Sequence, residues 1–400
     1  MTSLDAAGPL ELHAPKLHTH VLPYMALAMM AGTTAGMLRA LSPVFAIHLG
    51  ASNAQIGLIS SLESLGMAAM TLPAGVLVSR YGPRIVYVIA SLIITTVYCI
   101  VPWAHSWIVL GIGLGIGGSC MPFRIVAVSS SFLERLKELG ASKAGWYSGS
   151  GTVGTLLVGP ALATVLLTHS GTTAGYLGIA FLFACMGLGG TVILARRPPP
   201  GPTTTFLQSF VQSARLLRDP VVSAICTIEV STGMVLAFFS AFIVVAAIRL
   251  VGLSEPAAIS VRLFEGIVSV GTMFLGGFLI RHRPLVWFYR LSLVLIVGGF
   301  GLLSLAHSYF ALVLATLLLG CGLGITSLIN IIRLGATDVP KSRVASLQLF
   351  SSMGGGFLGA LLGGLLSEYL GLQGMFLSGA FLYALLSYRW CFGPNRPALT

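Results

Sequence analysis

Apolar stretches of about 20 residues recur along almost the whole chain of 400 residues and are separated by short polar breaks. Each stretch is long enough to cross a hydrocarbon core of about 30 Å as an α-helix, which rises about 1.5 Å per residue. Only 8% of the residues are charged, whereas roughly a quarter are charged in a typical water-soluble domain. We therefore expect an integral membrane protein that uses the lipid bilayer as its solvent.

The spanning segments are predicted to be helices. Lipid cannot satisfy backbone N–H and C=O groups, so a spanning segment must be a helix or part of a closed barrel, and these runs are too long for barrel strands. The 49 glycines favour helices that approach one another closely. Polar breaks separate twelve predicted spans in two groups of six, near residues 21–48, 55–78, 85–104, 107–130, 145–168, 175–195, 220–248, 257–280, 286–306, 309–333, 346–367 and 372–392.

The two groups of spans define the predicted domain organisation. It consists of an N-terminal tail, a first six-helix bundle, a linker, a second six-helix bundle and a C-terminal tail: residues 1–20, 21–195, 196–219, 220–392 and 393–400. The apolar run after the first tail is too long for a cleaved signal. The linker combines a Pro-rich start with a short amphipathic pattern, which predicts either a surface helix or an unstructured connector.

The formal net charge of +11 is explained by topology. With twelve spans, alternate breaks place sixteen basic residues on one side of the membrane: Lys16, Arg80, Arg84, Arg135, Lys137, Lys143, Arg196, Arg197, Arg215, Arg218, Arg281, Arg283, Lys341, Arg343, Arg389 and Arg396. The other side has only Arg249. The positive-inside rule then predicts that both termini and the linker are cytoplasmic. We expect a location in the bacterial inner (cytoplasmic) membrane and no binding of nucleic acid.

The two predicted halves repeat one another in sequence. A shift of 201 residues aligns three residues between the second and third spans of each half, namely Gly75, Arg80 and Pro83 with Gly276, Arg281 and Pro284. A shift of 205 aligns four glycines of the fifth span of each half, namely Gly149, Gly151, Gly154 and Gly159 with Gly354, Gly356, Gly359 and Gly364. Duplicated halves are typical of alternating-access transporters, which hold their substrate near the bilayer midplane between them.

The break between the second and third spans resembles a motif of the major facilitator superfamily, which reads G-x-L-x-D-R-x-G-R-R. The matching residues are Gly75, Leu77, Arg80, Gly82 and Arg84. Ser79 replaces the acidic residue and Pro83 replaces the first of the closing basic pair. The resemblance implies an all-α fold of twelve transmembrane helices in two pseudo-symmetric six-helix bundles, and a loop (Gly75, Ser79, Arg80, Gly82, Arg84) that steadies one access state.

A second pattern lies in the fifth predicted span. Gly159-Pro160 follows several glycines and resembles part of the antiporter pattern G-x-x-x-G-P-x-x-G-G, although Thr155 replaces one of its glycines. This pattern, together with methionines in the first two spans, supports an alternative reading as an efflux permease for amphipathic or toxic compounds.

Ionisable residues inside the predicted spans are the candidates for function, because each costs at least about 2.5 kcal/mol to insert. They are Arg39, Glu63, Arg124, Glu229, Arg262 and Glu265. Glu63 precedes Arg80 by nearly the same length of chain that separates Glu265 from Arg281. The two carboxylates are therefore predicted to occupy matching positions that face one central cavity.

Arg39 and Arg124 have no carboxylate within a turn of their own helices. Each is predicted either to bind a substrate anion, since a guanidinium donates two parallel hydrogen bonds to a planar carboxylate or phosphate, or to pair with a carboxylate such as Glu63 on another span. The candidate substrate-binding residues are thus Arg39, Arg124 and Glu63.

The three carboxylates are candidates for proton coupling, because a buried carboxyl group can bind and release a proton. Glu229 is preferred, followed by Glu63 and Glu265, because Glu229 has no basic neighbour on its own helix face. Arg262 and Glu265 are three residues apart and share a helix face, which favours a structural ion pair between them.

Other chemistry finds no support in the sequence. The two G-x-G-x-x-G patterns do not follow strands, and no Gly-Lys dipeptide is present, which excludes dinucleotide binding and the usual P-loop. The six cysteines and the histidines lack metal-ligand spacing. We expect no cofactor, no metal site and no enzymatic activity.

The leading hypothesis is a secondary active transporter that moves a small organic solute, most simply an anion, as a monomer coupled to protons. Symport and antiport both remain open. The efflux permease is the alternative within transport, and a transporter-like receptor or assembly factor is the alternative from another class.

Overall fold

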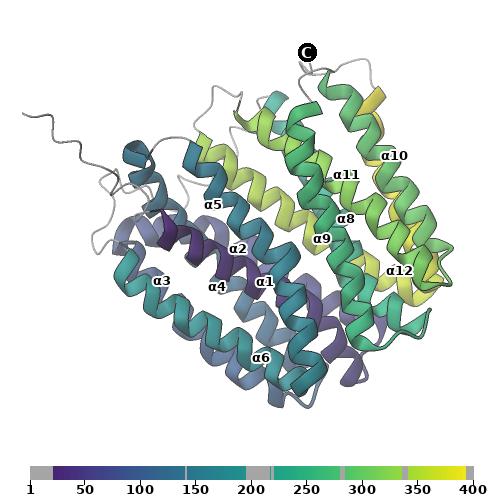
Figure 1. Ribbon diagram of the computed structural model, residues 1–400, viewed down its shortest axis with the longest axis horizontal. Coiled ribbons are helices and arrows are strands. Elements are labelled where there is room, and N and C mark those ends of the chain that lie inside the picture. Colours follow the sequence, from purple (N-terminus) through teal and green to yellow (C-terminus); the bar gives the residue numbers. More distant parts are fainter. Residues whose placement is uncertain are drawn as a thin grey trace, which may run out of the picture.

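The structure, a computed structural model, describes residues 21–139, 142–194, 217, 220–279, 284–335 and 341–392. Helices fill nearly all of these ranges, and no β-strand occurs within them (Figure 1). The first half contains α1 (Leu22–His48), α2 (Asn53–Tyr81), α3 (Pro83–Ile100), η1 (Val101–Trp103), α4 (Trp107–Leu139), α5 (Ser142–Val153), η2 (Gly154–Val158) and α6 (Gly159–Ile193). The second half contains α8 (Pro220–Arg249), α9 (Glu255–Leu279), α10 (Leu285–Ser304), α11 (Tyr309–Gly335) and α12 (Lys341–Phe392).

The predicted tails lie outside the described residues, as does the predicted linker apart from Leu217. Eight described helical segments are long and apolar enough to cross a membrane. Two of these, 145–193 and 347–388, each consist of two helices joined at a glycine with non-helical geometry, Gly171 and Gly371. Each join falls at a predicted boundary between two spans. The all-helical membrane fold is confirmed, and the count of twelve spans stays a prediction.

Glycines in matching turns of the two halves have the same backbone conformation. Gly171 and Gly371 occupy matching positions in the two halves and have φ of 77° and 71°. Gly50 and Gly252 each follow the first helix of their half and have φ of 72° and 71°. Positive φ is readily adopted only by glycine. The duplication inferred from the sequence therefore extends to the conformation of the turns.

Helix contacts repeat in the same way. A Cβ added to Gly154 would lie 2.3 Å from the carbonyl oxygen of Met29, and one added to Gly359 would lie 2.4 Å from that of Met234. The offset that aligns the two glycines also aligns the two methionines. Small residues here let the fifth helix of each half pack directly on the backbone of the first.

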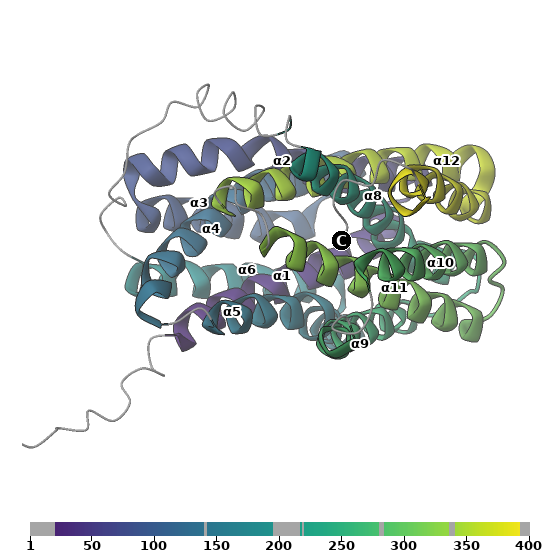
Figure 2. The ribbon, with the colours of Figure 1, turned by 90° about the horizontal axis from the view of Figure 1, so that it is seen from above.

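The two halves lie side by side, the first in purple to teal and the second in green to yellow (Figure 2). We call the end of the molecule that carries the start of α1 and the end of α12 the terminal face. The opposite end, with the turns at residues 49–52, 104–106, 171, 250–254, 305–308 and 371, is the distal face.

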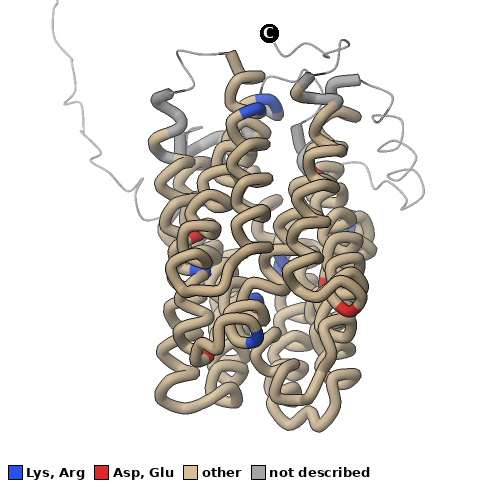
Figure 3. Tube along the Cα trace, turned by 90° about the vertical axis from the view of Figure 1, so that its right-hand side faces the viewer, with Lys and Arg blue, Asp and Glu red and all other residues tan. Residues whose placement is uncertain are grey.

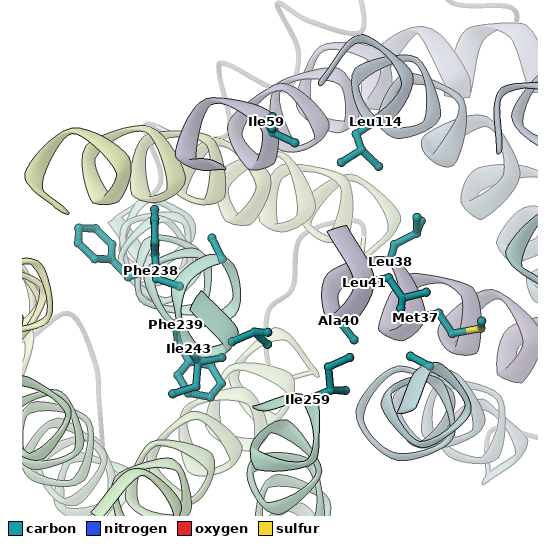
Figure 4. Packing of buried hydrophobic residues seen from close by; sticks show 14 of the residues in the cluster. Met37, Leu38, Ala40, Leu41, Ile59, Leu114, Phe238, Phe239, Ile243 and Ile259 are labelled. Atoms are coloured by element: carbon teal, nitrogen blue, oxygen red, sulfur yellow. The ribbon is translucent and has the colours of Figure 1, made fainter. Parts of the chain in front are cut away.

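The main contacts between the halves join α2 with α12, α1 with α8, and α9 with the segment from α5 to α6, and smaller ones join α2 with α8 and α1 with α9. Near the distal face, a Cβ on Gly57 would lie 2.5 Å from the Cα of Gly364. A Cβ on Gly266 of α9 would lie 2.2 Å from the carbonyl oxygen of Leu156 in η2. Between the halves, buried Ala40 of α1 faces buried Ile259 of α9 (Figure 4). The halves thus meet at close backbone contacts in this state.

Candidate functional site

Charged residues are few in the described chain, and several lie between the two ends of the bundle (Figure 3). Three of them line one cavity of about 360 Å³ inside the first half, which we call the first-half cavity. They are Arg39 on α1, Glu63 on α2 and Arg124 on α4. The structure therefore brings together the three residues predicted from the sequence to bind substrate.

The rest of the first-half cavity is mixed in character. Small residues of α1 and α5, two tyrosines and two methionines complete most of its wall: Ala28, Ala31, Gly32, Ala35, Gly151, Tyr87, Tyr147, Met67 and Met121. The cavity reaches Ser148, near the start of α5 and hence toward the terminal face. A lining that combines apolar surface with a few polar groups is typical of small-molecule sites.

A smaller cavity of about 70 Å³ lies between the two halves, among α1, α2, α8 and α12; we call it the central cavity. Arg39, Glu63 and Met67 line both cavities. These three residues therefore form the boundary between the first-half cavity and the interface with the second half.

Arg124 is held by neutral partners. Its Nε donates to the hydroxyl of Ser91 at 3.0 Å, and Nη2 donates to the hydroxyl of Tyr87 at 3.1 Å. The guanidinium carbon lies 5.0 Å from the ring centroid of Tyr87 and 4.4 Å from that of Phe183, within the range of cation–π attraction. Among the described residues, Nη1 has a single, distant contact, 4.0 Å from the sulfur of Met121. The positive charge is thus oriented but not neutralised by these contacts.

A side-chain ion pair joins His48 and Glu255, and none involves Arg39, Glu63 or Arg124 among the residues that the structure describes. Arg39 and Arg124 therefore form no ion pair with Glu63, which was the structural alternative to substrate binding. No carboxylate of the described chain neutralises either guanidinium by direct contact.

Glu63 and Glu265 occupy matching positions, as the repeat predicts. A Cβ on Gly118 would lie 2.2 Å from the carbonyl oxygen of Glu63, and one on Gly320 would lie 2.6 Å from that of Glu265. One offset relates both the glycines and the glutamates. However, Glu265 is buried with its carboxylate 3.5 Å from the hydroxyl of Ser269, and it lines neither of the cavities that Glu63 lines. The expectation that both carboxylates face one cavity is therefore not met by Glu265.

Arg262 and Glu265 do not form the direct ion pair expected from their spacing. Arg262 instead donates from Nη1 to the main-chain carbonyls of Arg39 at 3.0 Å and Ser240 at 3.1 Å. Sequence spacing brings two side chains onto one helix face, but a neighbouring helix with a free carbonyl competes for the donor.

Glu229 lies outside both cavities, in a polar network of the second half. Its Oε1 accepts from the side-chain amides of Asn330 at 2.8 Å and Gln348 at 2.6 Å. Tyr289 donates to Asn330 at 2.9 Å, and Arg333 donates to the hydroxyl of Tyr289 at 3.4 Å. The amide residues were missed from the sequence, although uncharged polar side chains inside predicted spans signal such networks.

The motif between α2 and α3 forms a tight turn at Gly82, whose φ is 85°. Pro83 is the first residue of α3, a position where the missing N–H costs nothing. Ser79 donates to the carbonyl of Val76 at 2.8 Å, and Arg80 stacks over the ring of Tyr81 with its guanidinium carbon 5.5 Å from the centroid. Ser79 is thus occupied within its own helix, and the role of this loop in an access state stays a prediction.

A polytopic helical membrane protein with two matched halves and an internal polar cavity has the architecture of a membrane transporter. The family model of the Major Facilitator Superfamily matches residues 24–348. The chain belongs to this superfamily, and it is a transporter rather than an enzyme.

Solved structures with the same fold cover nearly the whole chain. The nucleoside transporter NupG has a TM-score of 0.73 and 15% identity, over 94% of this chain and 98% of its own. A bacterial homolog of the human lysosomal transporter Spinster, solved in an inward-facing and unoccupied conformation, has a TM-score of 0.72 and 17% identity, over 93% and 96%. A POT family transporter in complex with 5-aminolevulinic acid has a TM-score of 0.75 and 13% identity, over 94% and 96%. No curated protein matches the chain significantly.

Proposed function

We propose that this protein is a proton-coupled carrier of a small organic anion, which binds in the first-half cavity between Arg39 and Arg124. The observation that carries this proposal is that two arginines, from α1 and α4, line one cavity without an ion pair to any carboxylate of the described residues. A cation at membrane depth is costly unless it is paired. A bound anion supplies the missing partner.

Arg124 is prepared for such an anion. Tyr87 and Ser91 fix two of its three nitrogens, and the stacked rings hold the guanidinium plane. Because the planar guanidinium group is already held in one orientation, less conformational entropy is lost when a planar carboxylate or phosphate binds. Nη1, which has only the long contact with Met121, is the donor available to a ligand.

Glu63 is the proposed proton carrier, ahead of Glu229. Glu63 lines the same cavity as both arginines, whereas the Oε1 of Glu229 already accepts two amide donors away from that cavity. Protonation of Glu63 removes a negative charge next to the anion site, so proton binding and anion binding favour each other.

We also propose which side of the membrane the cavity opens to. The first-half cavity reaches toward the terminal face, while polar contacts join the halves at the distal face. If both termini are cytoplasmic, as the positive-inside rule predicts, this is a state open toward the cytoplasm.

The test is flux into liposomes containing the purified protein, with a broad panel of radiolabelled organic anions and an imposed pH gradient. We expect uptake of at least one anion class, driven by the pH gradient, and its loss in Arg39→Ala and Arg124→Gln. Arg333→Gln is the matched control, because it also removes a buried arginine but lies outside both cavities. No gradient-dependent flux across the panel, or unimpaired flux in both cavity variants, would refute the proposal.

Export of amphipathic compounds is the second candidate, since tyrosines and methionines form much of the wall beside the two arginines. This second candidate differs from the anion carrier in the direction of transport and in the size of the apolar part of the transported molecule. It predicts that deletion of the gene raises sensitivity to amphipathic toxic compounds, and an unchanged sensitivity profile counts against it.

A further inference from the structure

Pro43 lies inside α1, four residues after Arg39. In an α-helix the carbonyl of residue 39 accepts a hydrogen bond from the N–H of residue 43, but proline has no N–H. The carbonyl of Arg39 is therefore without its helical donor, although it lies deep in the membrane region. A main-chain carbonyl left unpaired there is costly.

The missing donor comes from the other half of the molecule. Nη1 of Arg262, on α9, donates to the carbonyl oxygen of Arg39 at 3.0 Å. Arg262 is 2% exposed, and its Nε has no partner among the described residues. The side chain is thus committed to this buried contact, at the desolvation cost of a charged group.

The second acceptor of Arg262 shows why the bond to α1 matters. Nη1 also lies 3.1 Å from the carbonyl oxygen of Ser240 on α8, within the second half. Four residues after Ser240 the chain has Val244, which has an N–H to donate. Only the first-half carbonyl depends on Arg262 for its hydrogen bond.

The depth of the contact places it between the distal face and the first-half cavity. Arg262 is seven residues into α9 from its distal end, about 10 Å at helical rise. One turn further along the same face, Gly266 packs against Leu156 of η2. Opening of the distal side requires α9 to separate from α1, and hence requires this hydrogen bond to break.

We infer that Arg262 is a positioning residue that holds the distal side closed by supplying the hydrogen bond that Pro43 removes from Arg39. Arg39 lines both cavities while its carbonyl is bonded to the second half. The substrate site and the contact between halves therefore share one residue. The link to transport rests on the proposed function, whereas the effect on opening does not.

The experiment measures the distance between spin labels on the two distal turns, at His105→Cys and Leu305→Cys. Both positions are exposed, and they belong to different halves. The six native cysteines are replaced by alanine, and thermal unfolding confirms that each variant is folded. No substrate is needed, so failure here is separate from failure of the proposed function.

We expect one short distance in the parent protein and a second, longer population in Arg262→Met, with the open-to-closed ratio raised about tenfold or more, as befits a hydrogen bond from a charged donor. Pro43→Ala restores the helical N–H, so the carbonyl of Arg39 keeps a donor when the distal side opens. This variant should therefore also raise the open-to-closed ratio, but less strongly than Arg262→Met. In the Pro43→Ala background, Arg262→Met adds little, because the carbonyl keeps a partner without it.

Unchanged distances in both single variants would overturn the inference. Fully additive effects in the double variant would also overturn it, because Arg262 would then act independently of the Pro43 break. If Arg262→Met does not fold, Arg262→Lys and Pro43→Ala decide the question, since Lys keeps the charge with a more weakly directed donor.

In transport assays the same variants distinguish an effect on the turnover rate from an effect on substrate affinity. Arg262→Met is expected to change the turnover rate more than the KM, because Arg262 contacts the main chain rather than the cavity. Loss of substrate affinity with an unchanged distance distribution would assign Arg262 to the binding site instead.

Discussion

Arg124 combines a buried positive charge with uncharged contacts throughout the part of the chain that the structure describes. Ser91 and Tyr87 satisfy two nitrogens, and aromatic rings cover the guanidinium face. At the matching position of the repeat, the second half has Thr326, whose hydroxyl donates to the carbonyl of Gly322 in its own helix. The charge that we assign to anion binding is therefore a property of the first half alone.

Replacement of Arg124 by lysine is expected to raise the KM for the transported anion by about tenfold or more. A lysine keeps the charge but loses the fixed planar fork and the stacking on Tyr87. Initial rates against substrate concentration in liposomes give the KM. Tyr87→Phe removes one hydrogen bond of about 1 kcal/mol and should have a smaller effect. An unchanged KM in the lysine variant would argue against direct contact.

Glu63→Gln tests the coupling residue. Parent protein should bind the anion more tightly at acidic than at neutral pH, because a proton on Glu63 removes the negative charge beside Arg39. Glutamine resembles the protonated form, so the variant should bind tightly at both pH values, exchange anion, and no longer accumulate it against a gradient. Glu229→Gln should keep pH-driven accumulation. The opposite result for the two variants would move the coupling role to Glu229.

At the scale of helices, proline and glycine decide the local geometry. Gly159 donates its N–H to the carbonyl of Gly154, and this wider hydrogen bond makes η2 a π-helical segment just before Pro160. Wider turns of this kind are frequent at functional positions. Thr155 of this segment lines the first-half cavity, and α9 packs on it at Gly266. One short irregular element therefore contacts both the cavity and the other half.

Substitution of Gly118 by alanine is expected to lower stability by about 1–3 kcal/mol, the usual cost of overpacking. Its Cβ would lie 2.2 Å from the carbonyl of Glu63, so α2 must shift. Thermal unfolding of the purified protein measures the loss. Gly320→Ala is the matched variant beside Glu265, and Gly75→Ala, with no atom within 4 Å of its Cβ, is the control.

The two alanine variants should differ in transport. Gly118→Ala displaces Glu63 in the cavity and should impair coupling, whereas Gly320→Ala should mainly reduce stability. Equal loss of coupling in both would mean that Glu265 also takes part in proton transfer.

At the scale of the whole molecule, polar contacts join the halves across the distal face. Arg249 donates to Asn53 at 2.5 Å and to the carbonyl of Ala51 at 2.8 Å. His48 pairs with Glu255, and the N–H of Ala54 donates to Glu368 at 3.3 Å. These contacts are partly exposed, so each one contributes less than a buried contact.

Arg249→Ala should therefore raise the distal-open population less than Arg262→Met does, by about twofold to fivefold for an exposed contact. The same pair of spin labels reports the change. Higher salt should weaken the contribution of Arg249 and leave that of Arg262 nearly unchanged, because screening acts mainly on exposed charges. Equal salt sensitivity of the two would contradict the depth assigned to Arg262.

The orientation of the molecule can be tested in intact cells with a membrane-impermeant thiol reagent. A cysteine introduced at Leu305 on the distal face should be labelled from outside, and one introduced at Trp146 near the terminal face should not. Labelling of Trp146→Cys alone would reverse the predicted topology and with it the assignment of the access state.

The sequence by itself determined the membrane class, the helical fold, the duplication and the set of buried charges. These properties depend on the length and polarity of local segments and on residues repeated at a fixed offset. The match of Glu63 with Glu265 followed from their similar distances along the chain to Arg80 and Arg281, and matching contacts at Gly118 and Gly320 agree with it.

Only the tertiary structure decided which buried groups meet. Arg39, Glu63 and Arg124 line one cavity because α1, α2 and α4 each present one of these residues to it, and the rotation of a helix about its axis is not encoded in its hydropathy. Arg262 does not pair with Glu265 as expected. It donates instead to a carbonyl oxygen on α1, which Pro43 leaves without a helical donor. The partner of such an unpaired carbonyl can be identified only when the neighbouring helix that supplies it is in place.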